Sequence, residues 1–209
     1  MKNYRLLLGV AGLLLLVVHT SIGQVGPHTV TLKRTKLIST ANQVTPEVAD
    51  HALRIASYIL SSQDFQDSVS KRVYDHRNIC SGCGPSAASP QRTLAGSQVL
   101  QRLLAKPTAS LTLTVQPYGK KPKNGKCYGL GSTCPNSDSI LSYYQNIMCD
   151  MGDDFPFAYA YAVHLCHEYT HNVGYCHTDN SEQRDAAESV GWIAFHFLKQ
   201  WYDSGTRVP

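Results

Sequence analysis

The chain has 209 residues, a formal net charge of +4 at pH 7 and 16% charged residues. The densest basic run, Lys120–Lys126, is interrupted by proline and glycine, which is typical of a solvated loop. Composition therefore argues against a nucleic-acid-binding or membrane-surface protein, and we expect no nucleic-acid partner.

The first 23 residues have the pattern of a secretory signal peptide. Lys2 and Arg5 precede an apolar run, Leu6–Val18, that is too short to span a bilayer comfortably. Small residues in Ser21–Gly23 predict cleavage after Gly23. We therefore expect a secreted or periplasmic mature chain, Gln24–Pro209, that forms one monomeric domain without a stable membrane anchor.

Seven cysteines in an exported chain predict disulfide bonds and at least one unpaired thiol. Cys127 and Cys134 bracket a glycine-rich loop and are the simplest pair to predict. Cys80 and Cys83 are most simply a local disulfide, because no second C-x-x-C is present to complete a zinc knuckle. The other three cysteines flank a histidine-rich segment, and their pairing is left open: Cys149, Cys166 and Cys176.

The first half of the chain predicts helices and one clear strand. Residues 24–43 are polar and irregular, and a first strand near Val30–Leu32, a pro-segment and an unstructured arm all remain open. Thr45, Pro46 and Glu47 are helix-start residues for a helix reaching Leu60. A second helix is predicted over Leu94–Ala105, and the alternation of Leu111–Val115 predicts a strand.

In the second half, Ser139–Ile147 could be a strand or a helix, and we favour an edge strand. Two helices follow. The aspartates of residues 150–154 are too closely spaced for a calcium site, and we interpret them as a helix start favoured by the helix dipole. A largely buried helix follows over Pro156–Val173, with His164 as a core residue or a support for the site. Apolar spacing predicts a last helix over Arg184–Tyr202.

The helix over 156–173 carries the residues with the clearest chemistry. His167 and His171 are four residues apart, so both imidazoles lie on one face and can reach a single ion. Glu168 lies beside that ion rather than on it, where a carboxylate can take a proton from an activated water.

A third histidine requires the helix to end. On a continuous helix, His177 would lie about 9 Å beyond His171 and roughly 240° around the axis. Gly174 accepts the left-handed conformation that terminates a helix and turns the chain back. We therefore predict a helix end within a residue or two of Gly174, a positive φ there, and His177 returned as third ligand of one zinc ion.

The resulting pattern, H-E-x-x-H-x-x-G-x-x-H over residues 167–177, resembles the zinc-binding signature of the metzincin metallopeptidases. The resemblance implies an α+β zincin-like fold, in which a small twisted sheet packs on the active-site helix and a C-terminal helix follows. It implies Zn²⁺ held by His167, His171 and His177, Glu168 as general base, and a protein or peptide substrate paired along an edge strand. Tyr175 and Tyr202 are candidates for stabilising the oxyanion.

Other acidic residues compete for places at the metal. Some zincins use a glutamate from a later helix or an aspartate as third ligand, for which Glu188 and Asp179 are the candidates. Neither arrangement needs Gly174 or His177 at its position, so we expect His177. Acidic residues that could instead accept a hydrogen bond from a ligand imidazole also follow the motif: Glu182, Asp185 and Glu188.

One departure from the family keeps a second hypothesis open. Metzincins place a methionine-containing turn beneath the metal, whereas no methionine follows His177. The alternative is a zinc-stabilised secreted binding module with weak or no catalysis. Glu168 argues against it, because a purely structural site is normally closed by four protein ligands and needs no adjacent carboxylate. A zinc nucleoside deaminase is disfavoured, because its H-x-E and P-C-x-x-C pair is missing.

Overall fold

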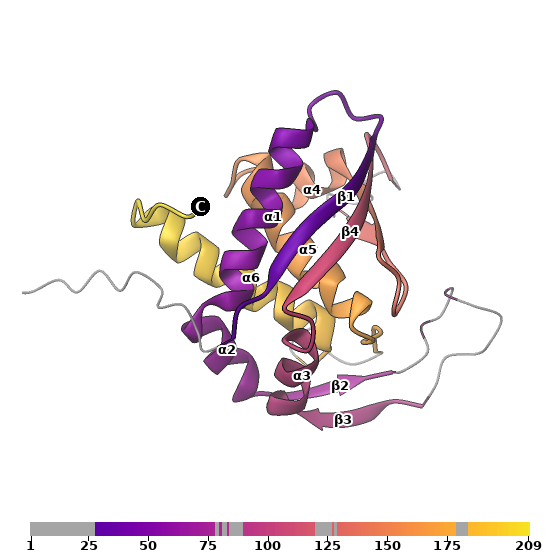
Figure 1. Ribbon diagram of the computed structural model, residues 1–209, viewed down its shortest axis with the longest axis vertical. Helices are drawn as coiled ribbons and strands as arrows, with labels where there is room; N and C mark the ends of the chain where they lie inside the picture. The colour runs from indigo at the N-terminus through magenta and orange to yellow at the C-terminus, as the bar shows by residue number, and fades with distance from the viewer. Residues whose placement is uncertain are drawn as a thin grey trace, which may run out of the picture.

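The protein combines α-helices with a small open β-sheet, as the computed structural model shows (Figure 1). The structure describes residues 28–77, 80, 83, 90–119, 127, 129–178 and 184–209. The predicted signal peptide and the basic run Lys120–Lys126 lie outside these residues. Six helices occur in the described part: α1 (Pro46–Ser61), α2 (Gln63–Ser70), α3 (Gly96–Leu103), α4 (Tyr144–Met151), α5 (Phe157–Asn172) and α6 (Ala186–Asp203).

The strands form two sheets. The larger has the order β1-β4-β6-β5, in which β1, β4 and β6 are parallel and β5 is antiparallel to β6. The smaller is an antiparallel β2–β3 pair, at the lower end of the view in Figure 1. The strands are β1 (Thr31–Ser39), β2 (Val73–His76), β3 (Arg92–Ala95), β4 (Thr108–Gln116), β5 (Gly131–Ser132) and β6 (Ser139–Tyr143).

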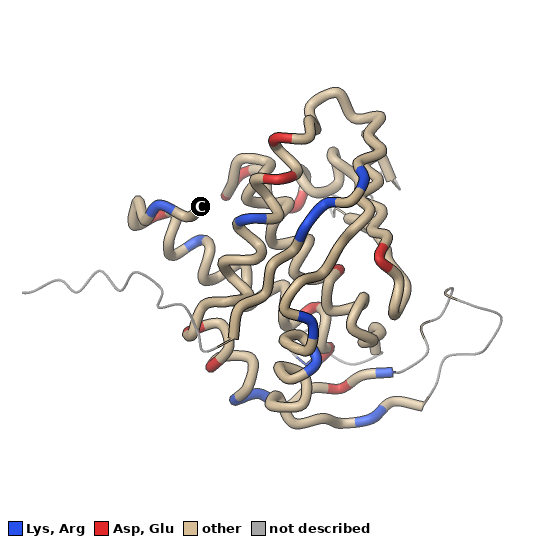
Figure 2. The backbone as a smooth tube through the Cα atoms, viewed as in Figure 1, with Lys and Arg blue, Asp and Glu red and all other residues tan. Residues whose placement is uncertain are grey.

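One face of the larger sheet is covered by helices. Alternate residues of β4 are buried, including Leu111, Leu113 and Val115, while Thr112 and Thr114 are half-buried on the other face. This alternation is the pattern that predicted the strand. The charged residues are spread over several helices and strands (Figure 2).

Helix α1 joins the sheet to the rest of the core. Thr45 caps it by accepting a hydrogen bond from the Val48 amide at 3.4 Å. Ser57 and Ser61 accept hydrogen bonds from backbone amides next to and within β1, each at 2.9 Å. The predicted helix is confirmed, and a strand is found in the segment where three alternatives were open.

Helix α5 lies at the centre of the molecule. It packs against both α1 and α6, and His164 reaches the sheet, where its Nε2 lies 3.2 Å from the Ser142 hydroxyl. Most of its residues are buried, which agrees with a sequence rich in alanine and aromatic residues. The predicted boundaries, Pro156–Val173, differ from the observed helix by one residue at each end.

Two predictions around β6 are wrong in part. The strand ends at Tyr143, and residues 144–151 form α4, because Tyr143 pairs with Gln116, where β4 ends. β6 is also not an edge strand, since it lies between β4 and β5. The aspartates of residues 150–154 do not start α5, which begins after Pro156 and has no acidic residue in its first turn.

Helix α3 is shorter than predicted. Leu94 pairs with Tyr74 in the β2–β3 ladder, so the helix begins only at Gly96. Gly96 lies against the backbone of the α2 end, where a Cβ would come within 2.2 Å of the Val69 carbonyl oxygen. A residue with a side chain could not occupy this position without displacing α2.

The disulfides differ from both predicted pairs. Cys80 pairs with Cys176, Cys83 with Cys134, and Cys127 with Cys149. The predicted Cys127–Cys134 and Cys80–Cys83 pairs are therefore wrong: the fold brings distant loops together, whereas the predictions used closeness in sequence. The expected unpaired thiol is Cys166, which is buried, and burial raises its pKa.

The disulfides also indicate the kind of cellular compartment in which the protein folds. Three such bonds are typical of proteins that fold in an oxidising environment outside the cytoplasm. Within the described part of the chain, no helix is both long and apolar enough to cross a membrane.

Candidate metal centre

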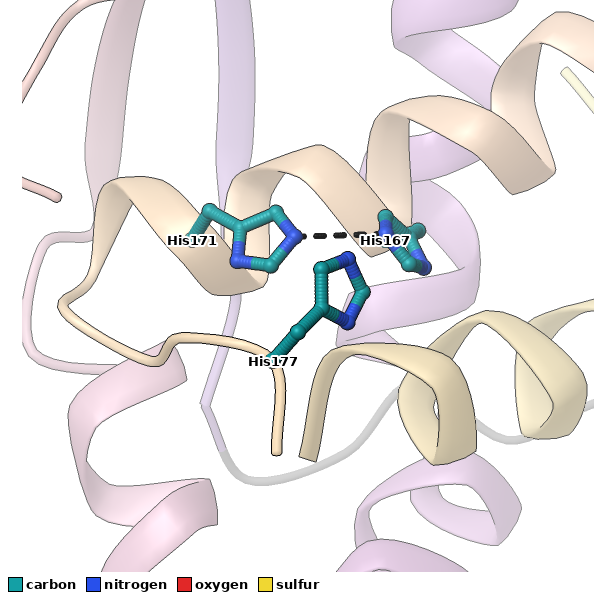
Figure 3. Close-up of side chains that lie close together, drawn as sticks. All are labelled: His167, His171 and His177. Atoms are coloured by element: carbon teal, nitrogen blue, oxygen red, sulfur yellow. Dashed lines mark hydrogen bonds between the residues drawn. The ribbon is translucent and has the colours of Figure 1, made fainter. Parts of the chain in front are cut away.

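Three histidines meet at the C-terminal end of α5 (Figure 3). His167 and His171 come from successive turns of the helix, and His177 comes from the segment that follows it. One nitrogen of each ring lies within 4.8 Å of one nitrogen of the other two. The predicted grouping is confirmed, and it is the group of potential metal ligands found within the described residues.

The helix ends as the glycine predicts. α5 stops at Asn172, and Gly174 has φ of +105°. The Gly174 amide donates to the His171 carbonyl at 2.8 Å, and the Tyr175 amide donates to the Thr170 carbonyl at 3.2 Å. These two bonds form a Schellman motif, which satisfies the last carbonyls of the helix and reverses the chain. The reversal brings His177 to the other two histidines.

The segment between the end of α5 and His177 is bonded to the end of β2. The Cys176 amide donates to the Arg77 carbonyl at 3.2 Å, and Cys176 is also covalently bonded to Cys80. Just before this point, the Asp75 amide donates to the Arg184 carbonyl at 2.6 Å. The end of β2 therefore holds both the segment that carries His177 and the segment that leads into α6.

Each ligand candidate has an acceptor near its Nδ1 atom. His171 Nδ1 lies 2.5 Å from the Tyr175 carbonyl oxygen, and His167 Nδ1 lies 3.8 Å from Glu188 Oε2. His177 Nδ1 lies 3.4 Å from Asp185 Oδ1. An imidazole that donates from Nδ1 keeps its lone pair on Nε2, so these contacts orient all three Nε2 atoms for a metal.

The nitrogen spacing fits zinc. His167 Nε2 and His171 Nε2 are 3.3 Å apart. A tetrahedral zinc ion with Zn–N bonds of about 2.0–2.1 Å places its ligand nitrogens about 3.3–3.4 Å apart. Without an ion, the same distance allows a hydrogen bond between the two rings, and it is short enough for both nitrogens to bind one ion.

Burial keeps two of the imidazoles neutral. It lowers the pKa of His171 to about 4 and the pKa of His167 well below its ordinary value. For His177, burial also lowers the pKa, but the hydrogen bond and charge of Asp185 outweigh this effect and raise the pKa overall. Neutral imidazoles have the free lone pair that metal binding requires.

Helix α6 supports the centre. Asp185 is buried and caps α6 through Oδ1, which accepts from the amides of Ala187 and Glu188 at 3.0 Å each. Its Oδ2 accepts from the Thr178 amide at 2.7 Å. Asp185 thus connects the start of α6 with the His177 segment, which confirms one of the three acidic residues expected to support a ligand.

The other acidic candidates have different outcomes. Glu188 does not replace His177: its oxygens lie 3.8 Å from His167 Nδ1 and 3.7 Å from His177 Nδ1, on the outer side of both rings. Asp179 and Glu182 lie outside the described residues. Gly191 brings α6 close to the site, since a Cβ there would lie 3.3 Å from the His167 Cβ.

Glu168 lies beside the histidines in a dry environment. Its side chain is 3% exposed, and Oε2 accepts no hydrogen bond from the described residues. Burial raises its pKa to about 8. Its Oε1 lies 3.8 Å from His164 Nδ1, and His164 is neutral because burial lowers its pKa to about 3. A buried carboxyl oxygen without a partner is costly and is characteristic of functional sites.

A cleft of about 1360 Å³ opens over the centre. It is lined by the three histidines and Glu168, by β5, and by the α4 end and α6 on the other side. Neither tyrosine proposed for the oxyanion lines it. Tyr175 is buried and its hydroxyl donates to the Gln98 carbonyl at 3.3 Å, while Tyr202 packs on Phe155 and Tyr159.

Some backbone groups that support the site could not be predicted from the sequence. The carbonyl group of Tyr175 orients the His171 imidazole, and any residue type provides a carbonyl. Comparison of the chain with protein-family models, curated proteins and solved structures found no significant match.

The Cys80–Cys176 bond is expected to stabilise the metal centre, because Cys176 directly precedes His177. We predict that Cys80→Ser/Cys176→Ser lowers zinc affinity by about 10- to 100-fold, the loss typical when the support of a ligand is removed. The double variant avoids leaving a free thiol beside the metal. Competition with a fluorescent chelator measures the affinity.

The matched control is Cys127→Ser/Cys149→Ser, which removes a disulfide that does not adjoin a histidine of the centre. It is expected to lose stability of about 2–4 kcal/mol, as disulfide removal generally does, while zinc affinity stays within about twofold of the native value. An equal loss of affinity in both double variants would contradict a specific role for Cys80–Cys176.

Proposed function

We propose that this protein is an exported zinc-dependent peptidase of metzincin type. The observation that carries the proposal is the combination of three converging histidines with a buried, unpartnered Glu168 oxygen beside them. Three protein nitrogens leave one position of a tetrahedral ion for water, which is the arrangement of catalytic rather than structural zinc sites. The sequence signature over residues 167–177 supports the same assignment.

The donor set favours zinc among common metals. Imidazole nitrogens bind zinc, copper, iron and nickel, whereas calcium and magnesium prefer oxygen ligands. The 3.3 Å separation of His167 Nε2 and His171 Nε2 is compatible with tetrahedral zinc, and the sequence signature favours zinc within the first group. His167, His171 and His177 would hold the ion, and Asp185 would keep the exposed ring of His177 in place.

Zinc and Glu168 have different roles in the proposed reaction. Bound zinc supplies Lewis-acid activation of a water molecule and of the substrate carbonyl. Glu168 accepts the proton of that water on a carboxylate oxygen and returns it to the leaving amine, as a general base and then a general acid. Its dry surroundings suit this role, because a raised pKa makes the carboxylate a stronger base.

A peptide substrate fits the side of the cleft formed by β5. Gly131 and Ser132 line the cleft, and β5 is the last strand of the sheet in the described part of the chain. An extended peptide could add its backbone beside such a strand, with one carbonyl placed over the histidines.

The second candidate is a zinc-stabilised secreted binding module. It is favoured by one observation, that no methionine follows His177 to form the turn found beneath the metal in metzincins. In this chain α6 occupies the space next to His167 instead, through Gly191. Glu168 disfavours the module, because burying a carboxyl oxygen without a partner has no structural benefit.

Hydrolysis of unfolded casein by the purified protein tests the proposal. We expect cleavage that stops when a chelator removes the metal and returns when stoichiometric zinc is added. Metal analysis should show one zinc per chain, and circular dichroism should show that the chelated protein remains folded. One bound zinc without cleavage of casein or of a peptide library would support the binding module instead.

A further inference from the structure

An aromatic wall lies in the cleft, one helical turn from the metal centre. Trp192 is 46% exposed, and it lines the cleft together with Phe195. Both residues are on α6, after Glu188 and Gly191, which adjoin His167. On the α5 side, Val163 lines the cleft one turn before His167, and Met151 contributes from the end of α4.

The wall is held in place by ring contacts. Trp192 meets Phe195 edge-on at 5.8 Å between centroids and stacks on His196 at 5.6 Å. Phe195 in turn meets the buried Phe155 edge-on at 5.3 Å. The Trp192 ring is therefore anchored on the core while much of its surface faces solvent, and an exposed tryptophan inside a cleft is characteristic of a binding surface.

The distances suit a peptide. One helical turn is about 5.4 Å, and an extended peptide advances about 3.3 Å per residue. A side chain one or two positions from the carbonyl at the histidines would therefore reach Trp192. Besides the imidazole and carboxyl groups of the centre, the cleft lining includes the side chains of Val163, Met151 and Trp192, together with Asp150 and Asp154 near Met151.

We infer that Trp192, with Phe195, Val163 and Met151, forms a specificity subsite for a large apolar or aromatic side chain of the substrate, next to the group bound at the metal. This inference rests on the proposed peptidase function, because it places the substrate carbonyl at the histidines. Trp192 is the residue that determines the preference, since it is the exposed member of the wall.

Two hydroxamates that differ only beyond their metal-binding group test the subsite. Acetohydroxamic acid reaches the zinc alone, whereas 3-phenylpropanohydroxamic acid also carries a phenyl ring toward the wall. Calorimetry on the zinc-loaded protein should show about 10-fold tighter binding of the phenyl compound, a typical gain for burying one aromatic ring. In Trp192→Ala the ratio of the two affinities should fall to about two or less, while the affinity for acetohydroxamic acid stays unchanged. Trp192→Phe should retain most of the native ratio.

Controls separate the subsite from the peptidase activity. Tyr118→Ala removes an exposed aromatic residue outside the cleft lining and should leave the ratio unchanged. Trp192 and Trp201 are the two tryptophans, and Trp201 is buried, so quenching by the phenyl compound should disappear in Trp192→Phe. A native ratio near one, or a ratio that persists in Trp192→Ala, overturns the subsite. A Trp192-dependent ratio in a protein that cleaves no peptide supports the subsite and contradicts the peptidase.

Discussion

Replacement of Glu168 by glutamine is expected to lower the rate of casein hydrolysis by about 10²- to 10⁴-fold, the contribution typical of a positioned general base. Glutamine has nearly the same volume but cannot accept and return the proton. Within the described residues, Glu168 Oε2 has no hydrogen-bond partner and Oε1 lies 3.8 Å from His164, which is not a ligand candidate, so zinc content should remain at one ion per chain. Initial rates at saturating zinc, together with metal analysis of the same preparations, measure the two effects separately.

Glu188→Gln is the matched control, because it removes the carboxylate of a second glutamate near the histidines. Glu188 faces the outer nitrogens of His167 and His177, so its loss should weaken zinc binding while the rate per bound zinc stays within about tenfold of native. If Glu188→Gln abolished hydrolysis and Glu168→Gln did not, the general base would be Glu188 and the assignment of Glu168 would be wrong.

Replacement of Gly174 by valine is expected to lower zinc affinity by more than about 100-fold, beyond the loss typical for a supporting residue. Gly174 has φ of +105°, which β-branched residues adopt only under strain. Space is not the obstacle, since the nearest atom to an added Cβ is an Arg102 nitrogen at 3.5 Å. Relief of the strain would rotate the chain after α5 and move His177 away from the other two histidines.

Gly205→Val is the control for Gly174→Val, because it introduces backbone strain away from the three histidines. Gly205 also has a positive φ, +69°, and nothing lies within 4 Å of an added Cβ. It follows α6 and does not line the cleft. This variant should lose a similar amount of stability, about 1–3 kcal/mol, and keep native zinc affinity. Native zinc affinity in Gly174→Val would show that His177 reaches the metal without the left-handed turn.

The metal centre could be predicted from sequence because its geometry is local. Two histidines four residues apart on a helix must share a face, and only a helix end brings His177 back within a few residues. Gly174 supplies that end, and its positive φ is confirmed. Each step depends on backbone geometry over about ten residues, and more distant groups, such as Cys80 and Asp185, then hold the returned segment in place.

The parts that were predicted wrongly depend on distant partners. Cys80 pairs with a residue 96 positions away, and only the assembled fold sets that distance. The end of β6 at Tyr143 reflects the end of its partner β4 at Gln116, which the β6 sequence does not contain. The position of Trp192 in the cleft depends on how α6 packs on α5, so its role in the cleft could not be predicted from the apolar spacing of the helix.

The positions of the disulfides imply that one region of the molecule depends on them to resist local unfolding and that another region does not. All three bonds join loops or element ends around the cleft, and their six cysteines line it. The packing of α1, α5 and α6 with the sheet uses none of them. Under reducing conditions, amide hydrogens of α1 and β4 should keep their slow exchange with solvent, while those near Cys134 and Cys176 should exchange quickly, since local opening follows local contacts. The rim of the cleft would then become accessible to added proteases such as trypsin while the core stayed folded.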